Sequence, residues 1–456
     1  MMETKKTKIT RRDFLETTGR VVAGVTLSSS ISHLMAEQTK SNKTRLAIVG
    51  TGVRACSMFG RDLLREHGDY VEIVGLCDIN PGRLEYAKSY MGAKCSTFTD
   101  FDKMIAETKP DKLLVTTVDS THDEFIVRGL NAAVDVITEK PMTTDEVKCQ
   151  NILDAEKRTG RKVIVTFNYR YSPHRTKIYE ILRENTIGEI TSVDFSWYLN
   201  TEHGPRYMRR WHGLREKSGT LLVHKSTHHF DLLNWWLNSD PEEVFAYGDL
   251  SFFGKNNSFR SQKCRGCPHK DKCELYWDIT QNEHLTKLYV ENEHYDGYIR
   301  DACVWREEIN IFDKMSVLIK YASGVQANYS LTTYSPYEGY RLAFNGTKGR
   351  LETWIHEKQS WPMNNFDELR LTMNFGDTKL IQIPHAEGGH GGGDIRMKDK
   401  LFKDPNMPDP FKQSAGTRDG AMSILVGVAA RKSIDTGETV QIGSLTEIKP
   451  QAVRPD

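Results

Sequence analysis

The segment HKSTHHFD, residues 224–231, gathers three histidines and a lysine within eight positions. Histidine gains and loses a proton near neutral pH, and a neighbouring lysine adds positive charge, so this segment suits acid–base chemistry on a bound substrate. The apolar run LLNWWL follows at once and contains Trp235 and Trp236. A surface loop would not need two tryptophans behind it. We therefore expect the histidines at the mouth of a buried helix with Ser226 or Thr227 as its N-cap.

The segment RLAIVGTGVRA, residues 45–55, carries the pattern Gly50–x–Gly52–x–x–Ala55 where a buried strand turns into a helix. The first glycine permits a tight turn, the second lets the backbone approach a diphosphate, and the helix N-terminus presents N–H groups to it. The same turn occurs in α/β domains that bind no nucleotide. Here, however, the next strand, VEIVGLCD, ends at Asp78, whose carboxylate can accept hydrogen bonds from ribose hydroxyls. The sequence therefore predicts a dinucleotide site.

The charge of Asp78 predicts NAD rather than NADP as the cofactor, because a carboxylate at this position repels a 2′-phosphate. Arg83 is the only cation nearby in the sequence that could weaken this preference. We expect Val53 and Arg54, which follow Gly52 in the turn, to contact the cofactor as well.

Four cysteines form a second group with possible metal chemistry. Cys264, Cys267 and Cys273 fall within CRGCPHKDKC, and Cys303 follows thirty residues later. Four thiolates at such spacing can hold a structural zinc ion, form two disulfides after export, or remain free. The stretch of about 254–303 has low apolar content, so we expect it to need a metal site or a disulfide to hold it folded. Structural zinc is our first expectation; catalytic zinc is disfavoured because four thiolates close the coordination shell.

A glycine-rich segment, HAEGGHGGGD, spans residues 385–394. Glycines this dense allow a loop to approach a ligand closely, so that His390 and Asp394 could touch substrate hydroxyls. A mobile surface loop would have the same composition.

The chain's composition limits the classes of partner. With 456 residues it is long enough for two or three domains. Sixty-two basic and sixty-one acidic residues leave a formal charge of +1. Nucleic-acid and anionic-membrane binding depend on a concentrated positive field, so neither is expected, and no segment is suited to membrane insertion.

Residues 1–36 have the pattern of an export signal. A basic segment containing TRRDFL, with Arg11 and Arg12, precedes a short apolar stretch that is rich in serine. The paired arginines resemble the twin-arginine motif, although an accidental pair in a Sec-type signal would look alike. We expect cleavage near Ala36 and a periplasmic or otherwise exported protein.

The elements behind these groups change in character near residue 168. Over 45–168, short apolar runs alternate with amphipathic segments, which predicts βαβ units and a parallel sheet of the Rossmann type. Over 169–456 the predicted strands are longer, alternating and rich in β-branched and aromatic residues, which favours a large open, mostly antiparallel sheet. The fold class is α/β, and the cysteine-rich stretch reads as an insertion in the second domain.

Taken together, RLAIVGTGVRA, CDINPGR, TEKPM, FNYRYSP and STHHFDLLNWWL resemble the Gfo/Idh/MocA oxidoreductases, the relatives of glucose–fructose oxidoreductase and inositol dehydrogenase. The resemblance covers nearly the whole mature chain, from about residue 45 to 444. Its most specific elements are Glu139–Lys140–Pro141 and the pair His228–x–x–Asp231.

The resemblance implies a fold, a cofactor and a set of site residues. An N-terminal Rossmann domain would hold NAD or NADP, and a C-terminal α/β domain would cover the nicotinamide and form a homo-oligomer interface. Glu139 and Lys140 are expected to bind the cofactor. The resemblance implies that Lys140 lies beside the nicotinamide and substrate and that His228 is the acid/base. The remaining expected substrate contacts are Tyr169, Arg170, His224, Asp231 and His390.

The chain departs from the family pattern at one position. Many members have an aspartate four residues before the histidine, where it can hold the imidazole's tautomer and raise its pKa; this chain has His224. His224 is therefore expected either to contact substrate hydroxyls or to replace His228 as the acid/base.

Three functions follow from these observations. The first is an NAD-dependent oxidoreductase acting on a sugar or glycoside hydroxyl, redox-neutral overall because an exported protein has no NAD pool to exchange with. The second is an NAD-dependent glycosidase that works through a transient 3-keto sugar. The third is a non-catalytic nucleotide- or sugar-binding protein, which the presence of both Lys140 and His228 disfavours.

Overall fold

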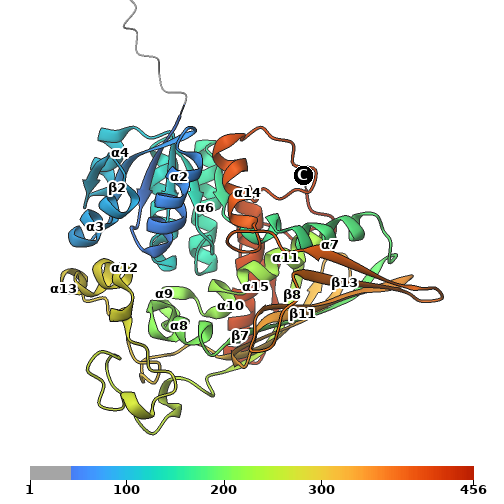
Figure 1. Cartoon of the computed structure of the whole chain (residues 1–456). Helices are drawn as coiled ribbons and strands as arrows, with labels where there is room; N and C mark the ends of the chain where they lie inside the picture. The colour runs from blue at the N-terminus through green and yellow to red at the C-terminus, as the bar shows by residue number, and fades with distance from the viewer. Residues whose placement is uncertain (1–42, 456) are drawn as a thin grey trace, which may run out of the picture. The chain divides into compact units, whose positions relative to one another are not determined.

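Residues 43–455 are described by the computed structural model, and their strands form two separate sheets (Figure 1). The predicted signal over residues 1–36, with Arg11 and Arg12, lies outside the described residues. Among residues 43–455, no helix is both long enough and apolar enough to span a bilayer.

The first sheet has six parallel strands in the order β3–β2–β1–β4–β5–β6. Its central strands are apolar runs without alternation, as expected when helices cover both faces. The strand order reverses between β1 and β4, and ligands bind at the carboxyl ends of strands at such a reversal. The strands are β1 Thr44–Val49, β2 Val71–Cys77, β3 Ser96–Phe98, β4 Lys112–Val115, β5 Asp135–Thr138 and β6 Val163–Val165. The helical segments between them are η1 Ala55–Arg61, α2 Asp62–His67, α3 Pro81–Met91, α4 Phe101–Thr108, η2 Asp119–Thr121, α5 His122–Asn131 and α6 Glu146–Thr159.

The second sheet has nine strands in the order β14–β13–β12–β11–β7–β10–β9–β8–β15 and is antiparallel except between β7 and β10. Buried and exposed residues alternate along β9, so one sheet face is covered and the other points outward. The strands are β7 Ile190–Asn200, β8 Pro241–Asp249, β9 Lys314–Tyr321, β10 Gln326–Ser335, β11 Glu338–Gly346, β12 Gly349–Lys358, β13 Phe366–Met373, β14 Thr378–Pro384 and β15 Val440–Gln441. The predicted fold class, a Rossmann-type parallel sheet followed by a large, mostly antiparallel one, is confirmed.

The α-helices of the second half are α7 Pro173–Arg183, α8 His203–Arg209, α9 Arg215–Ser218, α10 Leu221–His224, α11 Thr227–Leu237, α12 Glu283–Leu285, α13 Glu293–Asp296, α14 Gly393–Lys398 and α15 Thr417–Thr436. Of these, α15 packs on strand β8 of the second sheet, whereas α12 and α13 belong to the insertion described below. Helix α15 packs on α11 and β8 and also on α6 and β6, so it connects the two sheets.

Helix α11 carries the histidine segment and is buried along its whole length, as the run LLNWWL predicts. Its first turn is held by Thr227, whose Oγ1 lies 3.1 Å from Ser423 Oγ of α15. Ser226 is the N-cap residue, one of the two that the sequence predicts, but its Oγ lies 2.9 Å from Tyr329 Oη and makes no capping hydrogen bond. Packing and tertiary hydrogen bonds, rather than a capping hydrogen bond, therefore fix the start of α11.

The insertion predicted over about 254–303 consists of short turns of helix and passes close to α3 (Figure 1). An isolated bridge between Lys263 and Ala302 joins its two ends. Arg265 pairs with Asp301 and Glu293 and so holds the base of the insertion together.

The structure does not support the prediction of structural zinc in this insertion. Among the described residues, no group of three or more His, Cys, Asp or Glu side chains is arranged to hold a metal ion. Cys264, Cys267, Cys273 and Cys303 line one small crevice and are free thiols, so the alternative of two disulfides is not realised either. The insertion is instead held together by the backbone bridge and by the ion pairs of Arg265. The Cys264 Sγ accepts a hydrogen bond from Arg209.

Candidate active site

A cavity of about 1810 Å³ opens at the carboxyl ends of the parallel strands. Pockets for one small ligand usually measure roughly 300–1,000 Å³, so this cavity has room for two ligands side by side. Its walls come from the loops after β1, β2, β4 and β5, from the segment between α8 and α11, and from the insertion. The predicted site residues that line it are Gly50, Gly52, Val53, Arg54, Asp78, Arg83, Glu139, Lys140, Tyr169, His224, His228 and His390.

The glycine-rich turn after β1 has the conformation that a dinucleotide site requires. Gly50 has φ of +86°, and a Cβ at this position would lie 2.7 Å from the carbonyl group of Thr116. Only glycine therefore fits there. A Cβ at Gly52 would lie 3.3 Å from Tyr289 Oη, and the same hydroxyl accepts a hydrogen bond of 2.9 Å from the Val53 N–H. Tyr289 comes from the insertion, which thus covers the turn.

Asp78 is held in a fixed orientation at the end of β2. Its Oδ2 accepts hydrogen bonds from Thr51 N (2.7 Å) and Thr51 Oγ1 (3.0 Å), and its Oδ1 accepts one from Asn80 N (3.0 Å). Arg83 lies between two carboxylates, 3.5 Å from Asp78 and paired with Asp296. Its charge is therefore already compensated, and the site fits a ribose diol better than a 2′-phosphate.

Lys140 projects into the middle of the cavity from the end of β5. Its Nζ donates a hydrogen bond of 3.2 Å to the backbone carbonyl of His224. Burial lowers the pKa of Lys140 to about 8, although Asp119 and Glu139 oppose the shift. Glu139 pairs with Arg54 at 2.9 Å. Lys140 can thus supply a positive charge near neutral pH and can also release its proton.

His224 and Asp119 form a buried pair across the two halves of the protein. His224 Nδ1 lies 2.5 Å from Asp119 Oδ2, and both side chains are almost fully buried. Burial raises the pKa of Asp119 although Lys140 opposes the shift, and burial together with Lys140 holds the pKa of His224 well below its usual value. When Nδ1–H donates to Asp119 Oδ2, Nε2 is the ring nitrogen that is left to accept a hydrogen bond from the substrate.

His228 has no such partner. Its ring stacks on Tyr169 with centroids 4.1 Å apart and planes at 9°, and its buried Nδ1 has no hydrogen-bond partner in the structure. Burial holds the pKa of His228 well below its usual value. His228 lines the cavity as a neutral ring, while the orienting carboxylate that the family pattern leads one to expect serves His224 instead.

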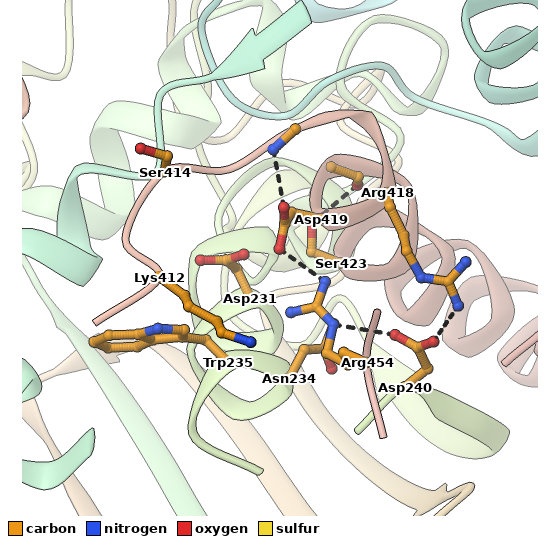
Figure 2. Close-up of polar contacts among 12 residues, drawn as sticks. Asp231, Asn234, Trp235, Asp240, Lys412, Ser414, Arg418, Asp419, Ser423 and Arg454 are labelled. Carbon is orange, nitrogen blue, oxygen red and sulfur yellow. Dashed lines mark hydrogen bonds and ion pairs between the residues drawn. The ribbon is translucent and has the colours of Figure 1, made fainter. Parts of the chain in front are cut away.

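The structure does not bring Arg170 and Asp231 to the cavity. They pair with each other through two hydrogen bonds of 2.8 Å and 2.6 Å, and both are buried. Asp231 lies beside Asp419, whose carboxylate binds Arg454 (Figure 2). The prediction that Arg170 and Asp231 contact the substrate is wrong, because neither lines the cavity and their ion pair ties the segment before α7 to α11.

His390 reaches the cavity from the glycine-rich loop, as predicted. Its Nδ1 lies 2.9 Å from Asp394 Oδ2, and Asp394 in turn accepts a hydrogen bond of 2.5 Å from Asn168 Nδ2. Asp394 does not itself line the cavity. The carboxylate anchors the loop, and His390 alone of the two can touch a ligand.

Several cavity residues were missed by sequence reasoning. Asp119 follows β4, and its place after a parallel strand was a usable signal. The others come from several separate segments of the second half, α8 and β11 among them, and had no distinguishing sequence pattern: His203, Tyr207, Arg210, His212, Tyr289, Arg300 and Glu338.

Comparisons with known proteins agree with this geometry. Residues 44–167 match the family described as "Oxidoreductase family, NAD-binding Rossmann fold". Residues 180–442 match "Oxidoreductase family, C-terminal alpha/beta domain". The chain is 39% identical over 427 residues to YteT of Bacillus subtilis (strain 168), a protein that its name assigns provisionally to the oxidoreductases; the match covers 87% of this chain and 99% of YteT.

Two further similarities are more distant. An inositol 2-dehydrogenase/D-chiro-inositol 3-dehydrogenase of Lactiplantibacillus plantarum (strain ATCC BAA-793 / NCIMB 8826 / WCFS1) is 24% identical over 209 residues, which cover 46% of this chain and 56% of that protein. A solved structure of levoglucosan dehydrogenase in complex with NADH and levoglucosan has a TM-score of 0.64 at 15% identity and covers 88% of this chain and 99% of its own. The latter similarity shows the fold alone.

Proposed function

Because the chain belongs to the Gfo/Idh/MocA oxidoreductase family, we propose that it is an NAD-dependent oxidoreductase acting on a hydroxyl of a sugar or glycoside. One observation carries the proposal. A buried His224–Asp119 pair and Lys140 converge in the same cavity as a dinucleotide-type glycine turn. Relatives named for inositol dehydrogenation support a polyhydroxylated substrate.

The residues of the cavity fit NAD. Gly50 has the backbone conformation of a dinucleotide-binding turn, Gly52 has no side chain to block a diphosphate, and the fixed carboxylate of Asp78 matches a ribose diol. The cofactor, when bound, supplies a hydride acceptor for the carbinol carbon. What the protein must add is a place for the hydroxyl proton and a charge that stabilises the developing alkoxide.

In the proposed mechanism His224 accepts the hydroxyl proton at Nε2. Nδ1 is already committed to Asp119, so Nε2 is the ring nitrogen that can bind substrate. Asp119 fixes the tautomer and stabilises the imidazolium that forms. Lys140, with its pKa lowered to about 8, directs its positive charge at the substrate oxygen and lowers the pKa of the hydroxyl.

This assignment replaces the expectation that His228 is the main acid/base. His228 lacks an orienting carboxylate, and its stacking on Tyr169 fixes the ring as a wall of the substrate site. It can still hydrogen-bond a sugar hydroxyl as a neutral imidazole.

We further propose that NAD stays bound through repeated turnovers and that the reaction is redox-neutral overall. Tyr289 of the insertion covers the glycine turn, and Asn292 of the same insertion accepts a hydrogen bond of 2.9 Å from Asn80 beside Asp78. A cofactor lying under these contacts would be released slowly. The twin-arginine pattern at Arg11 and Arg12 supports export of the folded protein with NAD inside.

A homo-oligomer also belongs to this proposal. The outward face of the second sheet presents Tyr247, Leu318 and Trp354, which are 71%, 55% and 45% exposed. An open sheet face with large apolar side chains favours burial against a second copy.

NAD-dependent glycoside cleavage remains a second candidate because His228 lines the cavity in addition to the proposed base His224. Oxidation alone needs one proton acceptor, whereas elimination from a keto sugar needs a second group to remove a C–H proton. His224 and His228 both line the cavity.

The test is to incubate the purified protein with a panel of sugars and glycosides and to follow both the absorbance of reduced cofactor and the release of aglycone. Oxidation or redox-neutral transfer that disappears in K140A supports the first function. Aglycone release that depends on Lys140 and bound NAD supports the second. Absence of any Lys140-dependent conversion across the panel contradicts both.

A further inference from the structure

Two arginines in the cavity wall lack an acidic partner. Arg210 follows α8, and its Nε donates a hydrogen bond of 2.6 Å to the carbonyl of Arg206. Its guanidinium lies 5.4 Å from the ring centroid of Tyr207. Arg300 lies at the end of the insertion, 4.6 Å from the ring centroid of Tyr289. Within residues 43–455, neither guanidinium forms an ion pair.

Other arginines in the same wall have their guanidinium groups occupied. Arg54 pairs with Glu139, Arg83 pairs with Asp78 and Asp296, and Arg306 pairs with Glu308. Arg209 donates to the Leu275 carbonyl and to Cys264. Arg210 and Arg300 therefore stand out from arginines that serve structural roles around them.

The two guanidinium groups face the same cavity but differ in their surroundings. Although burial opposes the shift, Tyr289 and Tyr298 raise the pKa of Arg300. Burial, and after it the charge of Arg300, lowers the pKa of Arg210 to about 10. Two partly exposed cations in one cavity wall repel each other, and an anion bound there relieves the repulsion. A protein that keeps such a pair in a ligand cavity gains binding free energy when an anionic group arrives.

The position of Arg210 indicates which ligand carries the anion. Its guanidinium lies over Tyr207, and the Tyr207 ring centroid lies 5.3 Å from that of His224, so Arg210 is next to the proposed acid–base pair. Its charge also acts on Asp119, His224 and His212. The centroid of the His212 ring lies 4.2 Å from that of His224. The anion would thus lie on the substrate side of the cavity, while the diphosphate of NAD is expected at the glycine turn.

We propose that Arg210 and Arg300 form a carboxylate subsite, and that the substrate is an acidic sugar of the uronic acid class or a glycoside of one. The proposal rests on the sugar-directed oxidoreductase function proposed above. A guanidinium presents paired N–H donors that match both oxygens of a carboxylate, which a neutral sugar cannot offer.

The test compares matched substrates on matched variants. Glucuronate with glucose, and galacturonate with galactose, differ only in the carboxylate at one end. We expect the wild-type protein to prefer the uronate in kcat/KM. In R210Q and in R300Q the preference should fall by about 10- to 100-fold, the magnitude expected for a lost hydrogen bond to a charged group. R210K should retain part of the preference. R206Q is the control, because Arg206 is exposed and pairs with Glu202 outside the cavity.

NAD affinity, measured by titration without sugar, separates the two anions. If R210Q and R300Q weaken NAD binding but leave the ratio of uronate to neutral sugar unchanged, the pair binds the diphosphate and the proposal is overturned. A wild-type preference for neutral sugars also overturns it. If no sugar is oxidised at all, calorimetric binding of uronate still decides: binding that disappears in R210Q supports the subsite while the oxidoreductase function fails, and absence of binding refutes the subsite.

Discussion

Replacing Asp119 by asparagine should remove most turnover while leaving NAD binding and the fold intact. Asp119 Oδ2 lies 2.5 Å from His224 Nδ1, and both groups are buried, so water cannot take over the contact. A hydrogen bond to a charged group contributes about 1.5–3 kcal/mol, which corresponds to about a 10- to 150-fold loss in kcat/KM if the charge matters mainly in the transition state. Asparagine keeps the shape but cannot stabilise the imidazolium.

The stability of this variant provides an independent check. Burial raises the pKa of Asp119 above its unfolded value, so the folded protein binds this proton more tightly than the unfolded chain. The contribution of Asp119 to stability is therefore greatest at low pH and falls as pH rises from the unfolded pKa towards the folded one. D119N removes this effect, and its melting temperature at neutral pH should not be lower than that of the wild type.

Steady-state kinetics with the best sugar of the panel, NAD titration and thermal unfolding would test this prediction. D123N is a matched control, because Asp123 lies four residues away, pairs with Lys148 and does not line the cavity. A kcat/KM for D119N equal to that of D123N would refute the reasoning. So would a strong loss in H228N with little change in H224N, since it would return the acid/base role to His228.

Four further predictions follow from the same geometry. The kcat/KM of the wild type should fall as pH rises through about 8, where Lys140 loses its proton. In K140M this decrease with pH should be absent and the rate should be about 10²–10⁴-fold lower, and a pH–rate profile measures both effects. Y289A should speed the release of NAD on dilution, followed by cofactor fluorescence, because it uncovers the glycine turn. D78N should raise the affinity for NADP relative to NAD in parallel titrations, since the repelling charge is gone. R170M should lower the free energy of unfolding in denaturant by about 3–5 kcal/mol, because it leaves the buried Asp231 carboxylate unpaired, with NAD affinity unchanged in the folded protein.

The acid–base pair shows what sequence alone could and could not reveal about the site. His224 and Lys140 stand in recognisable local patterns, one before a buried apolar helix and one at the end of a parallel strand. Asp119 is 105 residues from His224 in the chain. Its position after β4 marked it as a cavity residue, but its pairing with His224 depends on how the second half packs against the first, and no local pattern contains that information.

The errors have a common physical origin. Asp231 and Arg170 have the composition of a polar site, and their chain positions lie next to residues that do line the cavity. On α11, however, Asp231 lies three positions beyond His228 and bonds to Arg170, which itself bonds to Asp419 of α15. The cysteine cluster is similar: its spacing permits a metal site, yet the ion pairs of Arg265 and a backbone bridge already close the insertion.

Because Asp119 and His224 come from different halves of the protein, the acid–base pair forms only when the two halves are packed together. An aspartate at position 224 would sit on the same segment as His228, so the base and its partner would both belong to the second half. Here Asp119 comes from the loop after β4, His224 from the end of α10, and Lys140 from the end of β5. The base is oriented only when the sheets are packed together, and α15, which contacts both sheets, holds them there. A substitution that loosens α15 should therefore reduce turnover before it unfolds either sheet, because it separates His224 from Asp119 while leaving each half intact.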